Sequence, residues 1–189
     1  GEQVVGITRR AMAGEIDFEA ALDERVAMLA GKPKLLIDKM VADSRLTAGA
    51  HTLVRTMRAN GAFCYLVSGG FDALTDPIAA KCGFHNHHAN HLDHDEKTIS
   101  GTVQKPVLDR HAKVTYLQHY CAVHDVEAAT ACIGDGANDL DMLENAGFGV
   151  AFAGNPILRE KVALQLNHTD LTGLLFLQGY LQDQFVTDH

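Results

Sequence analysis

The feature that most constrains the fold is the stretch at residues 131–140, which reads Ala-Cys-Ile-Gly-Asp-Gly-Ala-Asn-Asp-Leu. Its apolar start predicts a buried strand, and the glycines on either side of Asp135 favour a tight turn that a ligand can approach closely. Open α/β sheets bind their ligands at the carboxyl ends of strands, which is where Asp135 stands. We expect Asn138 to cap the next helix and Asp139 to lie in its first turn.

The two acidic residues of this stretch, Asp135 and Asp139, stand four positions apart. Carboxylates held so close repel each other unless a positive group lies between them. Hard cations such as Mg²⁺ take carboxylate oxygens as ligands, which makes the turn a candidate metal site. Gly, Asp and Asn are also the ordinary residues of turns and caps that bind no ligand, and the stretch alone does not separate the two interpretations.

Helices and strands are predicted to alternate from residue 48 onward. Continuous apolar runs of strand length occur at 62–67 and 148–152, as in strands that are buried on both faces of a sheet. Asn155 followed by Pro is expected to begin one of the helices between strands. The alternation predicts an α/β fold with a doubly wound parallel sheet and a β-hairpin near 88–103.

Helical periodicity precedes the first predicted strand. Residues 2–13 and 18–29 carry apolar side chains at helical spacing, and Asp17 can cap the second of these helices. We therefore expect a helical cap subdomain over 1–45 and an α/β core over 46–189.

Two further places suggest anion binding. Residues 68–71, Ser-Gly-Gly-Phe, follow an apolar run and are expected to open a helix that ends near Cys82. A small hydroxyl and flexible N–H groups at a helix N-terminus suit an anion, although a plain turn would use the same residues.

Lys113 stands near the start of the helix that Asp109 opens, where a cation opposes the helix dipole unless an anion offsets it. The alternative is an exposed lysine on a solvated face.

Composition narrows the classes of partner. The 189-residue chain has a formal net charge of −8, which argues against nucleic acid and anionic membranes as main partners. No apolar run reaches the length of a membrane span and no signal peptide is visible, so we expect a cytoplasmic protein. The four scattered cysteines are typical of free thiols.

The histidines near the hairpin match no common zinc pattern, and we expect them on the surface: His85, His87, His88, His91 and His94.

The order of these motifs resembles one superfamily. A strand ending in Ser-Gly-Gly at residues 68–70, a later Lys113 and a strand ending in Gly-Asp-Gly-x-Asn-Asp are similar to the second, third and fourth motifs of haloacid dehalogenase-like (HAD) hydrolases. Within it, Ala-Met-x-Gly at 11–14, Asp-Phe at 17–18 and Arg-Val at 25–26 resemble the phosphoserine phosphatase family. The resemblance covers nearly the whole chain and implies a HAD-like core with a small helical cap.

The resemblance also implies catalytic roles. Asp135 would ligate Mg²⁺, and Asp139 would support the metal site from beside it. Lys113 would neutralise the phosphate and the nucleophile. The hydroxyl of Ser68 and the N–H of Gly69 would hold phosphate oxygens.

The substrate itself would be recognised largely by the cap. Arg25 would pair with the substrate carboxylate, a bidentate geometry that arginine suits. On the residues alone, an arginine at the edge of an apolar stripe is an equal interpretation. Phe18 and Met12 would help to close the pocket, and Asn138 would lie near the substrate.

One departure concerns the first motif of the family, Asp-x-Asp-x-Thr or Val, which supplies the nucleophile and the general acid and base. The sequence, which begins with Gly1, does not contain it. Asp17 lies within the expected cap and Asp43 precedes a helix, so neither replaces it. We expect the motif and its central strand, between the strands that end at Val67 and Ile133, to lie upstream, and we expect the sequence alone not to fold stably.

The implied activity is Mg²⁺-dependent hydrolysis of O-phospho-L-serine to L-serine and phosphate through a phosphoaspartate, the last step of serine biosynthesis. Four alternatives are left open: phosphotransfer to homoserine, another small-molecule HAD phosphatase, a non-catalytic protein without the nucleophile, and a fragment of a transport ATPase. The expected partner is the small-molecule substrate, and a homodimer is left open.

Overall fold

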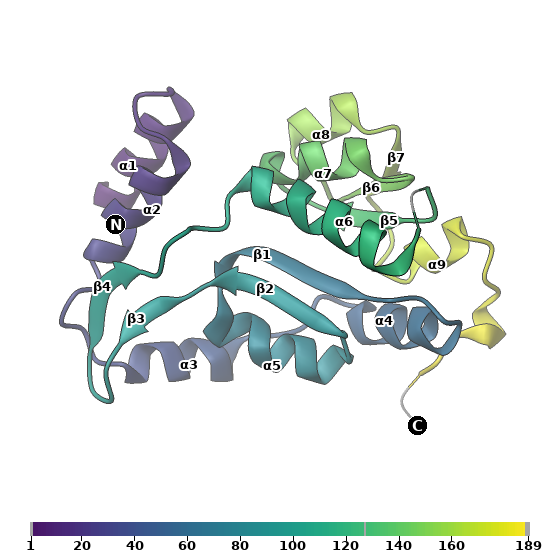
Figure 1. Cartoon of the computed structure of the whole chain (residues 1–189), viewed down its shortest axis with the longest axis horizontal. Coiled ribbons are helices and arrows are strands. Elements are labelled where there is room, and N and C mark those ends of the chain that lie inside the picture. Colours follow the sequence, from purple (N-terminus) through teal and green to yellow (C-terminus); the bar gives the residue numbers. More distant parts are fainter. Residues whose placement is uncertain (1, 127, 188–189) are drawn as a thin grey trace. The chain divides into compact units, whose positions relative to one another are not determined.

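The structure, a computed structural model, describes residues 2–126 and 128–187. Figure 1 shows the elements, which follow one another as α1 (Glu2–Met12), α2 (Phe18–Ala27), α3 (Leu35–Asp43), α4 (Ala50–Ala59), β1 (Tyr65–Phe71), α5 (Asp72–Cys82), β2 (Asn86–Asn90), β3 (Leu92–His94), β4 (Ile99–Val103), α6 (Arg110–His124), β5 (Ala131–Gly134), η1 (Ala137–Asp139), α7 (Leu140–Asn145), β6 (Phe148–Phe152), α8 (Pro156–Lys161), β7 (Leu164–Leu166), α9 (Gly173–Leu177) and η2 (Gln182–Gln184).

The chain divides into two compact units. The first consists of Gly1–Ser44, Ser68–Pro77 and His88–Asp109, and the second of Arg45–Val67, Ile78–His87 and Arg110–His189. The first segment of the first unit ends at Ser44, and the division into a cap over 1–45 and a core over 46–189 stays a prediction. The hairpin that we expected in the core belongs instead to the unit of the N-terminal helices.

The first unit has a core shared by helices and hairpin. Strands β3 and β4 pair antiparallel, as predicted, and the Asp95 carboxylate closes their turn by accepting the N–H groups of Lys97 and Thr98. In β4 alternate residues point inward, and Gly101 on this face has φ +84, where an added Cβ would lie 2.6 Å from that of Ala30. The buried apolar side chains of this core are Leu22, Val26, Ile37, Leu92, Ile99 and Val103.

The second unit contains the parallel sheet β5–β6–β7. Consecutive residues of a strand point to opposite faces, and accordingly Val150 and Ala151 pack into different clusters, each with no exposed surface. Helices α4 and α9 cover one face through Leu53, Leu174 and Leu175. Helices α7 and α8 cover the other through Leu143 and Leu158. Since helices cover both faces, the predicted doubly wound α/β fold is confirmed.

Residues 68–71 differ from the prediction. They continue strand β1, and helix α5 begins only at Asp72. The strand continues because β1 pairs with β2, and the side-chain amide of Asn90 donates to the carbonyl of Gly69 at 3.0 Å. The prediction of a helix N-terminus at Ser68 is therefore wrong.

The strands that lead into the two predicted ligand-binding segments are not neighbours. In the sheets that the described residues form, β1 pairs with β2 and β5 pairs with β6. A further strand between β1 and β5 stays a prediction. Over residues 2–126 and 128–187, no helix combines the length and apolar character that crossing a membrane requires.

Candidate active site

The loop that follows β5 is built around the carboxylate of Asp139. This side chain is only 5% exposed, and its Oδ2 accepts the backbone N–H groups of Asp135 at 3.1 Å and Gly136 at 2.9 Å. A Cβ added at Gly134 would lie 2.5 Å from the Cγ of Asp139, so only glycine leaves room for the carboxylate there. Asp139 thus folds the turn back onto the end of the strand.

The other oxygen of Asp139 binds a lysine from a different helix. Lys113, in the first turn of α6, is 6% exposed, and its Nζ donates to Oδ1 of Asp139. A buried ammonium and a buried carboxylate have both lost hydration, so each depends on the other. The interpretation of Lys113 as a solvated surface lysine is therefore wrong. One carboxylate fixes both the cation and the acidic turn.

Asp135 has the opposite environment. Its side chain is exposed, and no hydrogen bond or ion pair engages its carboxylate among the described residues. Mg²⁺ is usually held by one or two carboxylates together with waters and substrate phosphate. The residues present fit such an ion, because the Asp135 carboxylate offers oxygens as ligands. The Asp139 carboxylate is already bound to Lys113 and to the backbone of the loop. Within the described part of the chain, no group of three or more His, Cys, Asp or Glu side chains is arranged as a metal site.

Asn138 does not cap the helix as we expected. It is exposed within η1, whose N-cap is Gly136, and α7 starts after Asp139 without a side-chain cap bond. The prediction is wrong because a 3₁₀ turn separates the strand end from the helix. Its amide remains at the open side of the loop, next to the turn that carries Asp135.

A neutral thiol lies beside the buried ion pair. Burial, followed by the nearby Cys121 and the Asp139 carboxylate, raises the pKa of Cys132 to about 12. Such a thiol stays protonated at neutral pH and adds no charge to the site. All four cysteines are free, as predicted.

The sequence did not reveal the support that the turn receives from the β6–α8 loop. The N–H of Asn155 donates to the carbonyl of Asp135 at 3.1 Å, and Nε of Arg159 donates to the carbonyl of Gly154 at 2.7 Å. Asn155 also caps α8, as predicted, by accepting the N–H of Leu158. The signal available in the sequence was an arginine four residues after an Asn-Pro helix start.

The predicted cap residues lie in the first unit. Phe18 begins α2 and is 37% exposed. Arg25 is half-buried in the last turn of the same helix, where its Nε donates to the carbonyl of Ala21 at 3.1 Å. This contact uses one edge of the guanidinium and leaves its other N–H groups for a ligand. The side chain of Met12, at the end of α1, lies outside the described residues.

Ser68 and Gly69, the predicted phosphate-binding pair, also belong to the first unit. The Ser68 Oγ accepts the N–H of Gly70 at 3.0 Å, so the hydroxyl proton remains available for donation. The structure therefore brings Lys113, Asp135 and Asp139 together in the second unit and places the phosphate-binding and cap residues in the first.

Comparison with known proteins identifies the family of the chain. The family model described as haloacid dehalogenase-like hydrolase matches residues 3–144, a span that includes the acidic loop, Lys113 and Ser68. The chain belongs to the haloacid dehalogenase-like hydrolase family. Among solved structures, this HAD chain is similar to a substrate-bound phosphoserine phosphatase complex with a TM-score of 0.83 and 33% identity, covering 93% of this chain and 84% of that one.

Curated relatives of this HAD chain include phosphoserine phosphatases. It is 40% identical over 184 residues to one from Streptomyces coelicolor, covering 97% of this chain and 45% of that protein. It is 38% identical over 172 residues to one from Streptococcus thermophilus, covering 90% of this chain and 80% of that protein. The chain thus spans less than half of the Streptomyces coelicolor protein and most of the Streptococcus thermophilus one.

Proposed function

We propose that this HAD hydrolase is a Mg²⁺-dependent phosphatase that converts O-phospho-L-serine to L-serine and phosphate. The observation that carries the proposal is the double use of Asp139, which binds Lys113 with one oxygen and the Asp135 turn with the other. This ties a buried cation to the turn that carries an exposed carboxylate. The phosphoserine phosphatases from Streptomyces coelicolor and Streptococcus thermophilus support the choice of substrate.

Charge neutralisation is the contribution of the second unit. A Mg²⁺ ion held by Asp135 would polarise the phosphate and offset its charge. Lys113 supplies a second positive charge from a buried position, where electrostatic interactions are stronger than in water. Because Asp139 orients this ammonium before substrate arrives, little reorganisation is needed during the reaction.

Substrate binding is the contribution of the first unit. The Ser68 hydroxyl and the Gly69 N–H hold phosphate oxygens, and Arg25 pairs with the α-carboxylate of the amino acid. The family resemblance implies that Phe18 and Met12 would cover the bound substrate and that Asn138 would contact it. Of these roles, the one for Arg25 separates an amino-acid phosphate from other phosphomonoesters.

The nucleophile is assigned to no residue of this sequence. The family resemblance implies a phosphoaspartate, formed on the first Asp of Asp-x-Asp-x-Thr or Val and hydrolysed with the second Asp as acid and base. None of Lys113, Asp135 and Asp139 takes that role, because each is already used to hold charge or the loop. Turnover should be measured on the natural protein.

The test is phosphate release from O-phospho-L-serine with and without Mg²⁺. We expect Mg²⁺-dependent release, abolished by EDTA and restored by added Mg²⁺, with free L-serine as the product. Full turnover in EDTA would refute the metal assignment. Formation of phosphohomoserine when homoserine is added would instead favour phosphotransfer, and binding of phosphoserine without turnover would favour a non-catalytic protein.

A further inference from the structure

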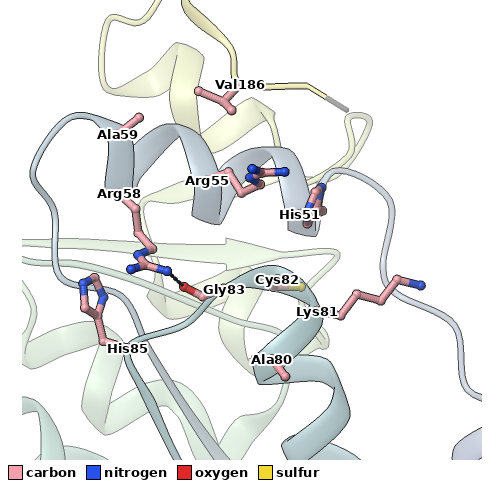
Figure 2. Close-up of a pocket in the computed structure, with 10 residues that line it drawn as sticks. All are labelled: His51, Arg55, Arg58, Ala59, Ala80, Lys81, Cys82, Gly83, His85 and Val186. Atoms are coloured by element: carbon pink, nitrogen blue, oxygen red, sulfur yellow. Dashed lines mark hydrogen bonds between the residues drawn. The ribbon is translucent and has the colours of Figure 1, made fainter. Parts of the chain in front are cut away.

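A polar pocket lies within the second unit, and none of Lys113, Asp135 and Asp139 lines it. Figure 2 shows this pocket, which has a volume of about 540 Å³ and is formed by α4, by the end of α5 with the turn that follows, and by Val186. Its lining contains Arg55, Arg58 and Lys81 together with two histidines, His51 and His85, and the described lining residues include no acid. In a chain with a formal net charge of −8, this is a local concentration of positive charge.

Arg58 is held in place at the pocket wall. Its Nη1 donates to the carbonyl of Gly83 at 2.5 Å, which Figure 2 shows as a dashed line. This contact fixes the plane of the guanidinium while its remaining N–H groups stay available. A fixed guanidinium is suited to the bidentate binding of a phosphate.

His85 adds a neutral donor next to this arginine. Its Nδ1 accepts the backbone N–H of Cys64 at 3.0 Å, so the neutral ring carries its proton on Nε2. Burial, and after it the charge of Arg58, lowers the pKa of His85. The imidazole can therefore donate a hydrogen bond without adding to the repulsion between the cations.

Two cations of the pocket, Arg58 and Lys81, are not neutralised by any carboxylate that the structure describes. Arg58 lines the pocket and makes no ion pair among the described residues. Lys81, in the last turn of α5, makes no ion pair among the described residues. Repulsion between like charges is relieved when a multiply charged anion binds between the groups.

We propose that this pocket binds a small phosphate-bearing anion with two or more negative charges, at a site separate from the catalytic one. Arg58 would grip a phosphate group in a fixed orientation, His85 would donate from Nε2, and Lys81 would supply a mobile charge. The size is suitable, since pockets for small molecules usually enclose roughly 300–1,000 Å³.

The probe is inorganic pyrophosphate, titrated in EDTA at constant ionic strength and followed by amide chemical shifts in two-dimensional NMR of the natural protein. We expect saturable shifts at the amides of Arg58, Gly83 and His85. Lys81→Gln should weaken binding roughly threefold to fivefold, as for loss of one exposed charge. Arg58→Gln should weaken pyrophosphate binding at least tenfold. Because Arg58 also bonds the carbonyl of Gly83, its replacement could act through the structure, and the Lys81 variant tests the loss of charge without that contact.

The matched control is Lys161→Gln, which removes an exposed lysine at the end of α8 and should leave the affinity unchanged. Shifts confined to the amides of Gly69 and Gly136 would place the only binding event at the proposed active site and overturn the proposal. Equal weakening by Lys161→Gln and Lys81→Gln would show a non-specific counterion effect and overturn it as well.

Discussion

The loop after β5 and the end of β1 make an instructive comparison, because both combine glycines with a polar side chain that follows an apolar run. The loop after β5 is tied to its surroundings by a carboxylate that accepts from Lys113, Asp135 and Gly136. At the end of β1, Ser68 makes one local contact, with the N–H of Gly70. Two segments of similar composition therefore differ in their contacts, because among the described residues only the loop after β5 receives a charged partner from a distant helix.

The same contrast separates the two acids of the β5 loop. The carboxylate of Asp139 is buried and fully engaged, whereas that of Asp135 is exposed and has no partner among the described residues. The comparison predicts that changes at Asp139 or its partner affect both folding and activity. Changes at Asp135 should affect activity and metal binding alone.

The largest effect is expected from Lys113→Ala. Breaking a buried ion pair leaves an uncompensated charge and costs about 3–5 kcal/mol, and the loss of a catalytic cation should reduce turnover by orders of magnitude. The measurements are the free energy of unfolding from denaturant titration and kcat. The control is Lys105→Ala, which removes exposed ion pairs with Glu19 and Asp23 and should change stability little, because exposed ion pairs are weak. Equal effects of the two variants would mean that Lys113 is not the catalytic lysine.

Asp135→Asn is expected to abolish turnover while leaving stability without metal nearly unchanged. The exposed carboxylate has no intramolecular partner to lose, but Mg²⁺ would lose a charged ligand. Phosphate release over a Mg²⁺ titration, together with a thermal melt in EDTA, checks both parts. Normal turnover at ordinary Mg²⁺ concentrations would contradict the role of Asp135.

Arg25→Ala is expected to have an intermediate and substrate-dependent effect. Losing a charged hydrogen bond costs about 1.5–3 kcal/mol, which should lower kcat/KM for O-phospho-L-serine roughly 10-fold to 100-fold. The value for p-nitrophenyl phosphate, which lacks the amino-acid carboxylate, should change little. Equal losses on both substrates would make Arg25 a structural residue, consistent with its contact to Ala21.

The smallest effect is expected from Arg159→Ala. This change removes the hydrogen bond to the carbonyl of Gly154, worth about 1 kcal/mol. Gly154 is followed by Asn155, whose N–H donates to the carbonyl of Asp135, so the change should loosen the support of the acidic loop. We expect the Mg²⁺ concentration for half-maximal activity to rise several-fold with little change in kcat at saturation. A drop in kcat without any change in Mg²⁺ dependence would contradict the idea that Arg159 supports the metal-binding loop.

The sequence predicted the parts that depend on local pattern. Apolar runs located β5 and β6, the Asn-Pro pair located α8, and the Gly-Asp-Gly turn located the acidic loop. It could not predict that Ser68 continues a strand, because this depends on pairing with β2 and on Asn90. The burial of Lys113 was equally hidden, since its partner Asp139 is 26 residues away in the chain. Likewise, the sequence could not show that the hairpin groups with the N-terminal helices, because its apolar face shows only that it is covered, not by which helices.

The most direct test is the effect of Mg²⁺ on the melting temperature of the natural protein and two variants, Asp135→Asn and Glu160→Gln. The last removes an exposed acid of α8 and serves as the control. A ligand at a hundred times its Kd stabilises by about 2.7 kcal/mol, so Mg²⁺ should raise the Tm of the natural protein and of Glu160→Gln. Asp135→Asn should have the same Tm in EDTA and show no rise. An undiminished rise in Asp135→Asn would contradict the assignment of Asp135 as the magnesium ligand.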